Sequence, residues 1–394
     1  MKRVVIVGTG MNADMLTAEG LQAVEEADVL IGAPRLIAQF ERLGKPSFAE
    51  YAPEAVAAIV ADYDKERFCV LVSGDSGFYS GAEGVSRVLK KYSPTLIPGI
   101  SSLSYFFARL KRPWQDAEVV SCHGRGGNLV DTVRRHLLTF VLTGGNSGEL
   151  GDELTQAGFG TLTAFVGENL GMPEERILRL PVSDLSDAGT GKLAVLLVEN
   201  PGYDGRVRFG IPDQEFIRGD LPMTKSEVRA VTMSRLALFP ESVCCDIGAG
   251  TGSVTVEMAL AAYKGRVFAV DKNQEAIRLV RENCRAFRVG NVTPISGEAP
   301  EALVTLPPLD AAFIGGSSGR LREIFDALLG KNPHIRMVIN AVTLETLYEG
   351  TEAFAAHGIT PEIIQAGVTR AVPAGKLHML KGGSPVFILS GGGK

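Results

Sequence analysis

The sequence predicts an α/β protein built from two domains. The chain has 394 residues, which is more than a single hydrophobic core usually organises. Strand-like runs alternate with amphipathic helical stretches over most of this length. The alternation stops once, in the Gly-, Pro- and charge-rich stretch NPGYDGRVRFGIPDQEFIRGDL, and then begins again. We therefore expect one domain at residues 1–203, a linker at 204–220 and a second domain at 221–394.

The first half contains eight strand candidates, which stand out by their β-branched and apolar residues. Amphipathic helices are expected between them, among others at Ala18–Ala27, Pro53–Tyr63 and Gly81–Lys90. The strand candidates are Val4–Val7, Val29–Ile31, Cys69–Val72, Thr95–Ile97, Glu118–Ser121, Phe140–Leu142, Thr161–Val166 and Ala194–Glu199.

The second half opens with a helix at Lys225–Phe239 and then alternates again. Its last two strand candidates, Glu362–Thr369 and Val386–Ser390, have no long helix between them and can therefore pair antiparallel. We expect a parallel sheet that ends in an antiparallel hairpin. The strand candidates that precede this hairpin are Ser242–Ile247, Arg266–Val270, Val292–Ser296, Ala311–Ile314 and Met337–Asn340.

Composition excludes several classes of protein. No apolar run reaches membrane-spanning length, and the N-terminus lacks the apolar stretch of a signal peptide. The net charge of −5 speaks against a nucleic-acid partner, which usually needs a basic surface. The five cysteines include no Cys-x-x-Cys pair. We therefore expect a cytoplasmic protein without a metal site and without a nucleic-acid or membrane partner.

A glycine-rich turn after the first strand of the second half indicates a cofactor site. The pattern is acid-x-Gly-x-Gly-x-Gly, from Asp246 to Gly252, and the third position of a dinucleotide fingerprint falls on Ser253 instead of glycine. A carboxylate at Asp246 would repel a pyrophosphate but attract an ammonium group. S-adenosylmethionine carries an ammonium and a sulfonium and no phosphate, so it fits this turn.

Two further positions match the remaining parts of that cofactor. Asp271 ends the next strand, where its carboxylate can accept hydrogen bonds from both ribose hydroxyls. Glu298 and Ala299 follow a third strand, where the adenine is expected. The second half is thus predicted to bind S-adenosylmethionine.

The second half resembles the precorrin-6B C-15 methyltransferase (decarboxylating) family of class I, Rossmann-like methyltransferases. The resemblance runs through the segments FGIPDQEF, MTKSEVRA, DIGAGTGSVTVE, AVDKNQEA, GEAPE and FIGGSSG. It implies cofactor contacts at Thr224, Gly248, Ala249, Gly250, Thr251, Gly252, Asp271 and Ala299.

The glycine turn near the N-terminus is of another kind. Gly8, Gly10 and Ala13 fit a relaxed dinucleotide fingerprint, and Asp28 has about the right separation from them. However, Asp28 precedes its strand, whereas a ribose-binding acid must lie at the carboxyl end. The first half is therefore not predicted to bind a dinucleotide.

The first half instead resembles the tetrapyrrole methylase family, in the branch that methylates precorrin at C-5. The segments GTGMNADMLTAEGLQAVEEADVLIG, GDSGFYSG, PGISS and VGENLGMPEERI carry this resemblance, while residues 11–14 depart from the family's usual Pro-Gly-Asp-Pro. It implies two α/β lobes with S-adenosylmethionine in the cleft, and hence one such site per domain. The implied contacts are Ser73, Gly74, Asp75, Phe78, Ser101 and Ser102.

Together the two resemblances imply methylation of precorrin-6B at C5 and C15, with loss of the C12 acetate carboxylate, to give precorrin-8 in cobalamin synthesis. They also imply a homo-oligomer. A sulfonium methyl group is already activated, so we expect no catalytic triad and assign no catalytic residue. An acidic protein that binds a polycarboxylate needs local cations; the candidates are Arg109, Lys111, Arg112, Arg125, Lys225, Arg229, Arg320 and Lys376.

Three alternatives stay open on the sequence. An RNA methyltransferase would use the first-half fold but should carry a basic stripe. A nicotinamide oxidoreductase is disfavoured by Asp246 and Ser253. In the third alternative, one half is a non-catalytic scaffold that only carries substrate.

Overall fold

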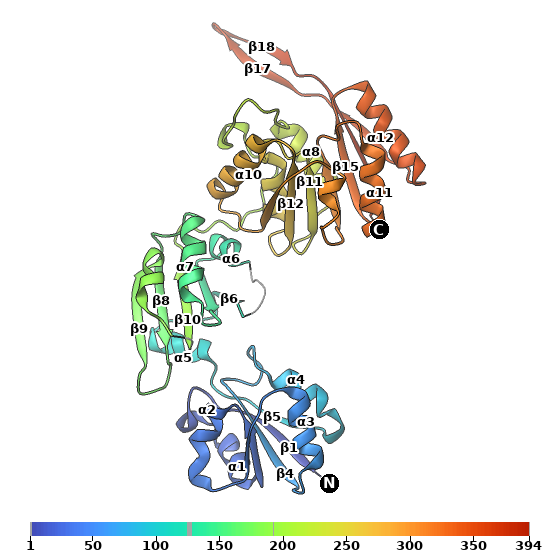
Figure 1. Cartoon of the computed structure of the whole chain (residues 1–394). Helices are drawn as coiled ribbons and strands as arrows, with labels where there is room; N and C mark the ends of the chain where they lie inside the picture. Colours follow the sequence, from blue (N-terminus) through green and yellow to red (C-terminus); the bar gives the residue numbers. More distant parts are fainter. Residues whose placement is uncertain (1, 124–127, 192, 394) are drawn as a thin grey trace. The chain divides into compact units, whose positions relative to one another are not determined.

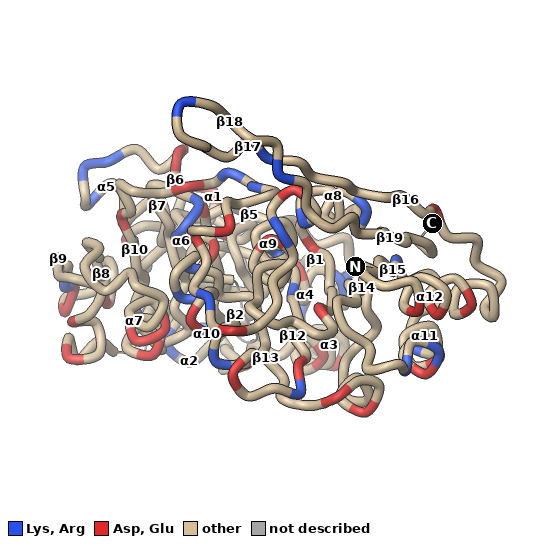
Figure 2. Tube along the Cα trace, turned by 90° about the horizontal axis from the view of Figure 1, so that it is seen from above, with Lys and Arg blue, Asp and Glu red and all other residues tan. Residues whose placement is uncertain are grey.

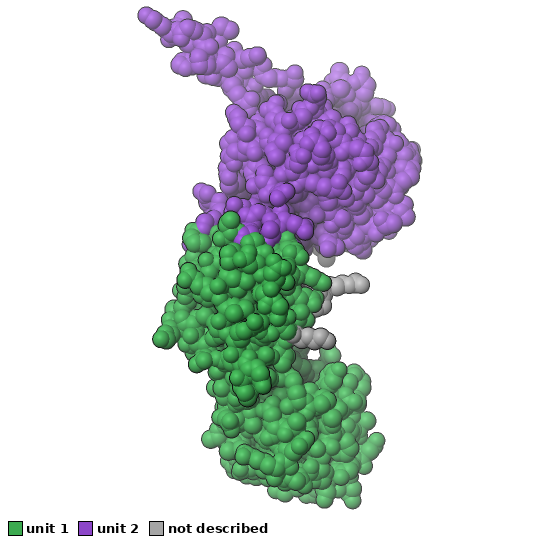
Figure 3. All heavy atoms as spheres, turned by 60° about the vertical axis from the view of Figure 1, so that its left-hand side comes forward, with its two compact units in different colours: residues 1–126, 137–152, 161–201 green, residues 127–136, 153–160, 202–394 purple. Residues whose placement is uncertain are grey.

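A computed structural model of the chain describes residues 2–123, 128–191 and 193–393. The chain separates into two compact units, which Figure 3 colours. Unit 1 comprises residues 1–126, 137–152 and 161–201, and unit 2 comprises residues 127–136, 153–160 and 202–394. Among the described residues, no helix is long and apolar enough to cross a membrane.

Unit 1 begins with a parallel five-stranded sheet of order β3-β2-β4-β1-β5. Alternate side chains of β1 enter cores on opposite faces, with Val4 and Ile6 on one and Val5 and Val7 on the other. The elements are β1 (Arg3–Gly8), α1 (Ala18–Glu26), β2 (Val29–Gly32), α2 (Pro34–Ile37), β3 (Ser47–Ala49), α3 (Pro53–Asp62), β4 (Arg67–Val72), α4 (Ala82–Val88) and β5 (Thr95–Ile97).

The second lobe of unit 1 has a mixed sheet of order β6-β7-β10-β8-β9, in which only β6 and β7 pair in parallel. The rings of Phe106 and Phe107 on α5 pack near that of Phe140 on β7, with centroid distances of 6.3 and 6.2 Å. The elements along this stretch of the chain are α5 (Ser102–Arg109), β6 (Ala117–Ser121), α6 (Leu129–Arg135), β7 (Leu138–Leu142), α7 (Ser147–Gln156), β8 (Thr163–Glu168), β9 (Arg176–Pro181) and β10 (Ala194–Glu199). Of these, α6 and the end of α7 from residue 153 on belong to unit 2.

Unit 2 is built on a seven-stranded sheet of order β13-β12-β11-β14-β15-β19-β16. Strands β12, β11 and β15 of this sheet are labelled in Figure 1. The sheet is parallel except for β19, which runs antiparallel between β15 and β16. Its core elements are α8 (Ser226–Leu236), β11 (Val243–Ile247), α9 (Ser253–Ala261), β12 (Arg266–Asp271), α10 (Gln274–Ala286), β13 (Val292–Ser296), β14 (Ala311–Ile314), α11 (Leu321–Lys331), β15 (Arg336–Ala341), α12 (Leu344–Ala356), β16 (Glu362–Ala366) and β19 (Val386–Gly391).

The predicted fold class is confirmed: the chain is α/β, with two lobes first and a Rossmann-like sheet second, and the last two predicted strands pair antiparallel. The sequence missed a second hairpin, β17 (Thr369–Ala374) with β18 (Leu377–Gly382), inserted between β16 and β19. It also missed β3 and β9. Most positions of β17 and all of β18 are exposed, so these strands lack the buried face that gives a period-two pattern.

The stretch that the sequence predicts as a linker supplies core residues to unit 2. Ile211 is 1% exposed and Phe216 is 5% exposed, and both belong to the core beneath α8 and α9. The ring of Phe216 lies 4.7 Å from that of Phe287. Gly and Pro suppress the local pattern here, but non-local packing still orders the segment.

Two further segments of unit 2 come from the first half of the sequence. Asp131 on α6 accepts a hydrogen bond from the backbone N–H of Gly290, with an N···O distance of 3.0 Å, and Asn128 donates to the carbonyl of Tyr263. The guanidinium of Arg288 lies over the ring of Phe159, 4.9 Å from its centroid. Unit 2 is therefore not a single continuous stretch of the sequence.

Replacing Phe216 by Ala should lower the free energy of unfolding of unit 2 by about 3–5 kcal/mol, because it opens a cavity between α8 and α10. The matched control is Phe209→Ala in the same stretch, since Phe209 is 48% exposed. That change should cost less than about 1 kcal/mol. Urea denaturation of the whole chain measures both; equal losses would show that residues 204–220 act only as a linker.

Candidate functional site

A cavity of about 880 Å³ opens at the carboxyl edge of the sheet in unit 2. This volume lies in the upper part of the range for small-molecule sites. The ends of β11, β12, β14 and β15 and the segment before α8 form its walls. Seven of the eight residues predicted here as cofactor contacts line it: Thr224, Gly248, Ala249, Gly250, Thr251, Asp271 and Ala299.

The turn after β11 requires glycine at two positions. Gly248 has a φ of +76°, and a Cβ there would lie 2.7 Å from the backbone nitrogen of Gly316. Gly250 has a φ of +54°, and its Cβ would lie 3.1 Å from the carbonyl oxygen of Pro222. A side chain at either position would push apart segments that enclose the cavity.

Gly252, the eighth predicted contact, does not line the cavity. Its φ is +77°, and a Cβ would lie 3.0 Å from the side chain of Val280 on α10. The geometry therefore gives Gly252 a packing role, in which it lets α9 begin close against α10.

Asp271 ties the glycine turn to the next helix. Its Oδ2 accepts a hydrogen bond from the N–H of Gly250 at 2.9 Å, and its Oδ1 accepts one from the N–H of Asn273 at 2.8 Å. Each carboxylate oxygen keeps a further lone pair. The side chain can thus hold the turn and still accept a hydrogen bond from a ligand in the cavity.

Asp246 is completely buried beneath the same turn. Its Oδ2 accepts a hydrogen bond of 2.5 Å from the hydroxyl of Thr255, while its Oδ1 has no partner in the described residues. Burial, with a smaller contribution from the charge of Asp271, raises the pKa of Asp246 to about 7. A cationic group nearby would favour the ionised form.

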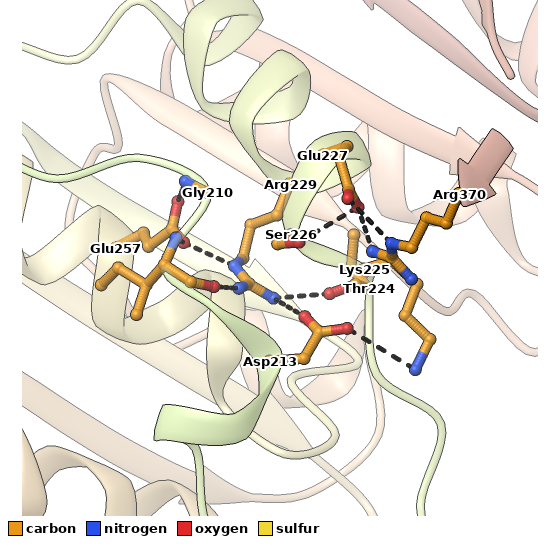
Figure 4. A network of polar contacts seen from close by, with 10 residues as sticks. Gly210, Asp213, Thr224, Lys225, Ser226, Glu227, Arg229, Glu257 and Arg370 are labelled. Carbon is orange, nitrogen blue, oxygen red and sulfur yellow. Dashed lines mark hydrogen bonds and ion pairs between the residues drawn. The ribbon is translucent and has the colours of Figure 1, made fainter. Parts of the chain in front are cut away.

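A buried ion pair fixes the segment that precedes α8 (Figure 4). Arg229 and Glu257 are both 0% exposed, and Nε of Arg229 lies 2.5 Å from Oε1 of Glu257. Arg229 also donates to the carbonyl of Thr224 at 2.6 Å and to that of Ile211. Glu257 accepts hydrogen bonds from the N–H groups of Gly210 and Ile211, at 3.0 and 2.9 Å. The network holds the wall that carries Thr224.

In unit 1 the predicted contacts gather where β1, β4 and β5 end. Gly10 and Gly74 exchange backbone hydrogen bonds of 3.1 and 3.0 Å. Asp75 accepts hydrogen bonds from the N–H groups of Gly77 at 2.7 Å and Gly99 at 3.1 Å, so both of its oxygens hold the chain. The carbonyl of Ile100 lies 4.0 Å from the position of a Cβ on Gly74.

The other predicted contacts of unit 1 also have roles within the chain. Ser101 caps α5 by accepting a hydrogen bond from the N–H of Ser104, and Ser102 is the first residue of that helix. Ser73 accepts a hydrogen bond from Arg35 at 2.9 Å. Phe78 lies 6.3 Å from Phe140 between ring centroids. Of these contacts, the one between Phe78 and Phe140 joins the two lobes of unit 1.

Asp28, which the sequence excludes as a ribose ligand, lies at the opposite edge of the sheet. It forms a salt bridge of 2.7 Å with Arg67 at the start of β4. This hydrogen-bonded pairing lowers the pKa of Asp28 to about 2.

Comparison with known proteins assigns a family to each half. The precorrin methyltransferase domain model matches residues 215–391, and the tetrapyrrole (corrin/porphyrin) methylase model matches residues 3–186. A precorrin-6Y C(5,15)-methyltransferase (decarboxylating) from a Sinorhizobium species is 31% identical over 326 residues, which are 80% of this chain and 78% of the relative. The chain belongs to this family. It is therefore an S-adenosylmethionine-dependent methyltransferase, as the sequence predicts.

Other relatives match one half of this precorrin methyltransferase. A probable cobalt-precorrin-6B C(15)-methyltransferase (decarboxylating) from Sulfurisphaera tokodaii is 39% identical over 189 residues, covering 46% of this chain and 96% of the relative. A crystal structure of precorrin-6y C5,15-methyltransferase from Geobacter metallireducens is 38% identical, with a TM-score of 0.45, and covers 47% of this chain and 97% of that chain.

The cations that the sequence proposes for binding substrate differ in their surroundings: among those described, one lines the cavity of unit 2, and others are held in ion pairs. Lys225 lines the cavity of unit 2. Arg229 is committed to the buried pair, and Arg320 pairs with Glu301 and Glu323. In unit 1, Arg109 forms an ion pair with Glu175, and Arg112 forms one with Glu199. Lys111 lies in a turn with a positive φ of 55°. Arg125 lies outside the described residues.

Sequence reasoning missed three cations that line the cavity: Lys272, Arg370 and Lys381. Lys272 directly follows Asp271, so the strand pattern could have placed it at this edge of the sheet. Arg370 and Lys381 lie on the β17–β18 hairpin, for which the sequence carries no buried face.

Replacing Asp246 by Asn should stabilise the chain in a pH-dependent way. Between about pH 4 and pH 7 the unfolded carboxyl is ionised while the folded one keeps its proton, so the stability of the wild type falls as pH rises. Asn keeps an acceptor for Thr255 without the charge. The gain in free energy of unfolding should grow from near zero at pH 4 to about 4 kcal/mol at pH 8. Denaturation at both pH values checks this, and a gain that is the same at both would contradict it.

Proposed function

We propose that this chain methylates precorrin-6B at C5 and C15 and removes the C12 acetate carboxyl group as CO2, giving precorrin-8 in cobalamin synthesis. Residues 1–203 carry out the C5 reaction in this proposal, and residues 221–394 carry out the C15 reaction and the decarboxylation. The main support is the relative that spans both halves and bears both reactions in its name. The five free cysteines agree with a reducing, cytoplasmic setting.

The cavity of unit 2 has features that suit S-adenosylmethionine. Its glycine turn brings backbone close to the cavity at Gly248 and Gly250, where a Cβ would press on the neighbouring segments. Asp246 is buried outside the cavity lining, but the unpartnered Oδ1 beneath the turn would favour an ammonium group bound above it. Asp271 lines the cavity and has free lone pairs for the ribose hydroxyls. These three observations support cofactor contacts at the predicted positions.

The cofactor supplies an activated methyl group, so the chain mainly has to orient the reactants. Holding two reactants in line contributes about 7–11 kcal/mol to the reduction of a barrier. In unit 2 the buried Arg229 network fixes the wall at Thr224, and the hydrogen bond from Gly250 to Asp271 fixes the turn. Both elements are thus held in position by hydrogen bonds within the chain.

Decarboxylation needs an electron sink, which the conjugated ring of the substrate provides. We assign no acid or base side chain to this step. The chain contributes apolar residues to the wall of the cavity, among them Val254, Val342, Val368 and Val386. Contact with such a wall would displace water from the carboxylate and favour cleavage of its C–C bond, so that CO2 leaves and the electron pair passes to the ring.

A second cofactor site belongs to the proposal for unit 1. Its support is the convergence of the Gly8–Gly10 turn, residues 73–75 and Ser101 at one edge of a parallel sheet. Ligands of open α/β sheets bind at the carboxyl ends of the strands. The proposal therefore requires two molecules of S-adenosylhomocysteine per chain, which also tests whether one half is only a scaffold.

Replacing Asp271 by Ala should weaken binding of S-adenosylhomocysteine to unit 2 by about 10- to 100-fold, because charge-assisted hydrogen bonds are lost. The control is Asp310→Ala. Asp310 accepts a hydrogen bond of 2.8 Å from the N–H of Val243, at the opposite edge of the sheet. Calorimetric titration of the whole chain should show one of the two sites weakened in Asp271→Ala and both sites unchanged in Asp310→Ala. Equal effects of the two variants would contradict the assignment.

The division of labour can be tested with two arginine substitutions. Gly250→Arg fills the turn of unit 2 and should abolish C15 methylation and decarboxylation, because a side chain at this positive φ would occupy the cavity. Gly74→Arg, at a φ of +68° in unit 1, should give a product that lacks only the C5 methyl group. Mass spectrometry of the products from precorrin-6B separates methyl gain from CO2 loss.

Circular dichroism of both variants, together with cofactor binding at the unaltered site of each, checks that the proteins are folded. The assignment fails if folded Gly74→Arg protein no longer releases CO2, or if Gly250→Arg protein still does.

A further inference from the structure

The β17–β18 hairpin brings two cations to the rim of the cavity in unit 2. Arg370 and Lys381 are directly paired in the antiparallel register, and both line the cavity. Directly opposed residues of an antiparallel pair project from the same face. Figure 2 shows basic positions along this hairpin. One face of the hairpin therefore presents two positive charges to the cavity.

This pairing has no evident structural benefit. Like charges directly opposite each other destabilise an antiparallel pair. Both residues are exposed, and within the described part of the chain Lys381 has no ion-pair partner. Two cations kept together at the mouth of a cavity indicate that an anion binds between them.

Arg370 has a partner that can be exchanged. It forms an ion pair with Glu227 in the first turn of α8, with 3.1 Å between Nε and Oε1 (Figure 4). The side chains are 50% and 44% exposed, and such surface pairs contribute about 0–1 kcal/mol. Glu227 also lines the cavity. A carboxylate of a ligand could therefore replace that of Glu227 at little cost.

The neighbouring surface suits the rest of a tetrapyrrole. Val372 of β17 and Val368, which directly precedes that strand, line the cavity beside Arg370. Val342, which directly follows β15, and Val386 at the start of β19 line it as well. An apolar wall with cations at its rim complements an apolar ring that carries carboxylates at its periphery. Arg suits this task because its planar guanidinium binds a carboxylate through two parallel hydrogen bonds.

We propose that Arg370 and Lys381 form a clamp for one peripheral carboxylate of the tetrapyrrole, and that Arg370 exchanges Glu227 for this carboxylate when substrate binds. This inference rests on the proposed function, because it takes the ring of that substrate as the ligand. The clamp positions the ring relative to the cofactor turn and sets specificity for a carboxylated ring. It takes no part in bond making or breaking.

The test measures KM and kcat for C15 methylation of precorrin-6B by the full chain. Arg370→Gln and Lys381→Gln should each raise KM by about tenfold or more with little change in kcat, because one charge-assisted interaction is lost. Arg370→Lys should fall between wild type and Arg370→Gln, since it keeps the charge but not the fork. Affinity for S-adenosylhomocysteine should stay unchanged in all three.

Two more variants make the test specific. Lys376, which the sequence offered as a substrate-binding cation, lies in the exposed turn of the same hairpin and is not part of the cavity lining, so Lys376→Gln removes the same charge and should leave KM unchanged. Glu227→Gln removes the competing anion and should lower KM severalfold, the opposite sign to Arg370→Gln. A rise in KM with Glu227→Gln would overturn the exchange.

The outcomes separate this inference from the proposed function. If the wild type methylates precorrin-6B at C15 but Arg370→Gln and Lys381→Gln keep its KM, the clamp is wrong and the function stands. If Lys376→Gln raises KM as much as they do, the clamp is wrong, because the overall positive charge of the hairpin then accounts for the effect. If the wild type does not methylate precorrin-6B, the proposed function fails and the clamp fails with it.

Discussion

The buried pair of Arg229 and Glu257 is the interaction on which the site of unit 2 depends. It joins α8, α9 and the segment before α8, and it anchors the carbonyl of Thr224 at the cavity wall. Removal of one partner from a buried, hydrogen-bonded pair typically costs about 3–5 kcal/mol, because the other charge is left without compensation. Glu257 lies on a helix that is buried on every side, so it could not recover by reaching solvent. The wall thus keeps one position.

Both parts of the chain solve the same geometric problem with different sheets. Parallel strands end at a common edge, and close approach of their loops there requires residues without a Cβ. In unit 2, Gly248 approaches Gly316; in unit 1, Gly8 and Gly99 approach each other and Gly74. In unit 2, a carboxylate, Asp271, then fixes the loops through backbone N–H groups, and Asp75 does the same in unit 1. The two sheets differ in strand order, so this shared arrangement of glycines and a carboxylate follows from the same packing requirement and not from a shared topology.

The chain carries a net charge of −5, yet its proposed substrate is a polyanion. Most of its arginines described above are neutralised by neighbouring carboxylates, as Arg109 and Arg320 are. Arg370 also has a carboxylate partner, Glu227, and within the described residues only Lys381 of the cavity-lining cations has no ion-pair partner; what distinguishes these cations is that they line the cavity. Local placement, and not total charge, therefore decides where an anionic ligand binds.

The sequence by itself determined the α/β class, most strands, the glycine turns and the acid at the end of β12. These features depend on local rules: strand periodicity, the backbone freedom of glycine and the position of a residue at a strand end. The tertiary structure alone decided which charged residues face the cavity. No local sequence pattern distinguishes Arg229 from Arg370, but Arg229 is buried in an ion pair with Glu257, whereas Arg370 lies on an exposed hairpin. It also decided that Ile211 and Phe216 are core residues, because their burial comes from partners distant in the chain, such as Phe287, which no local pattern records.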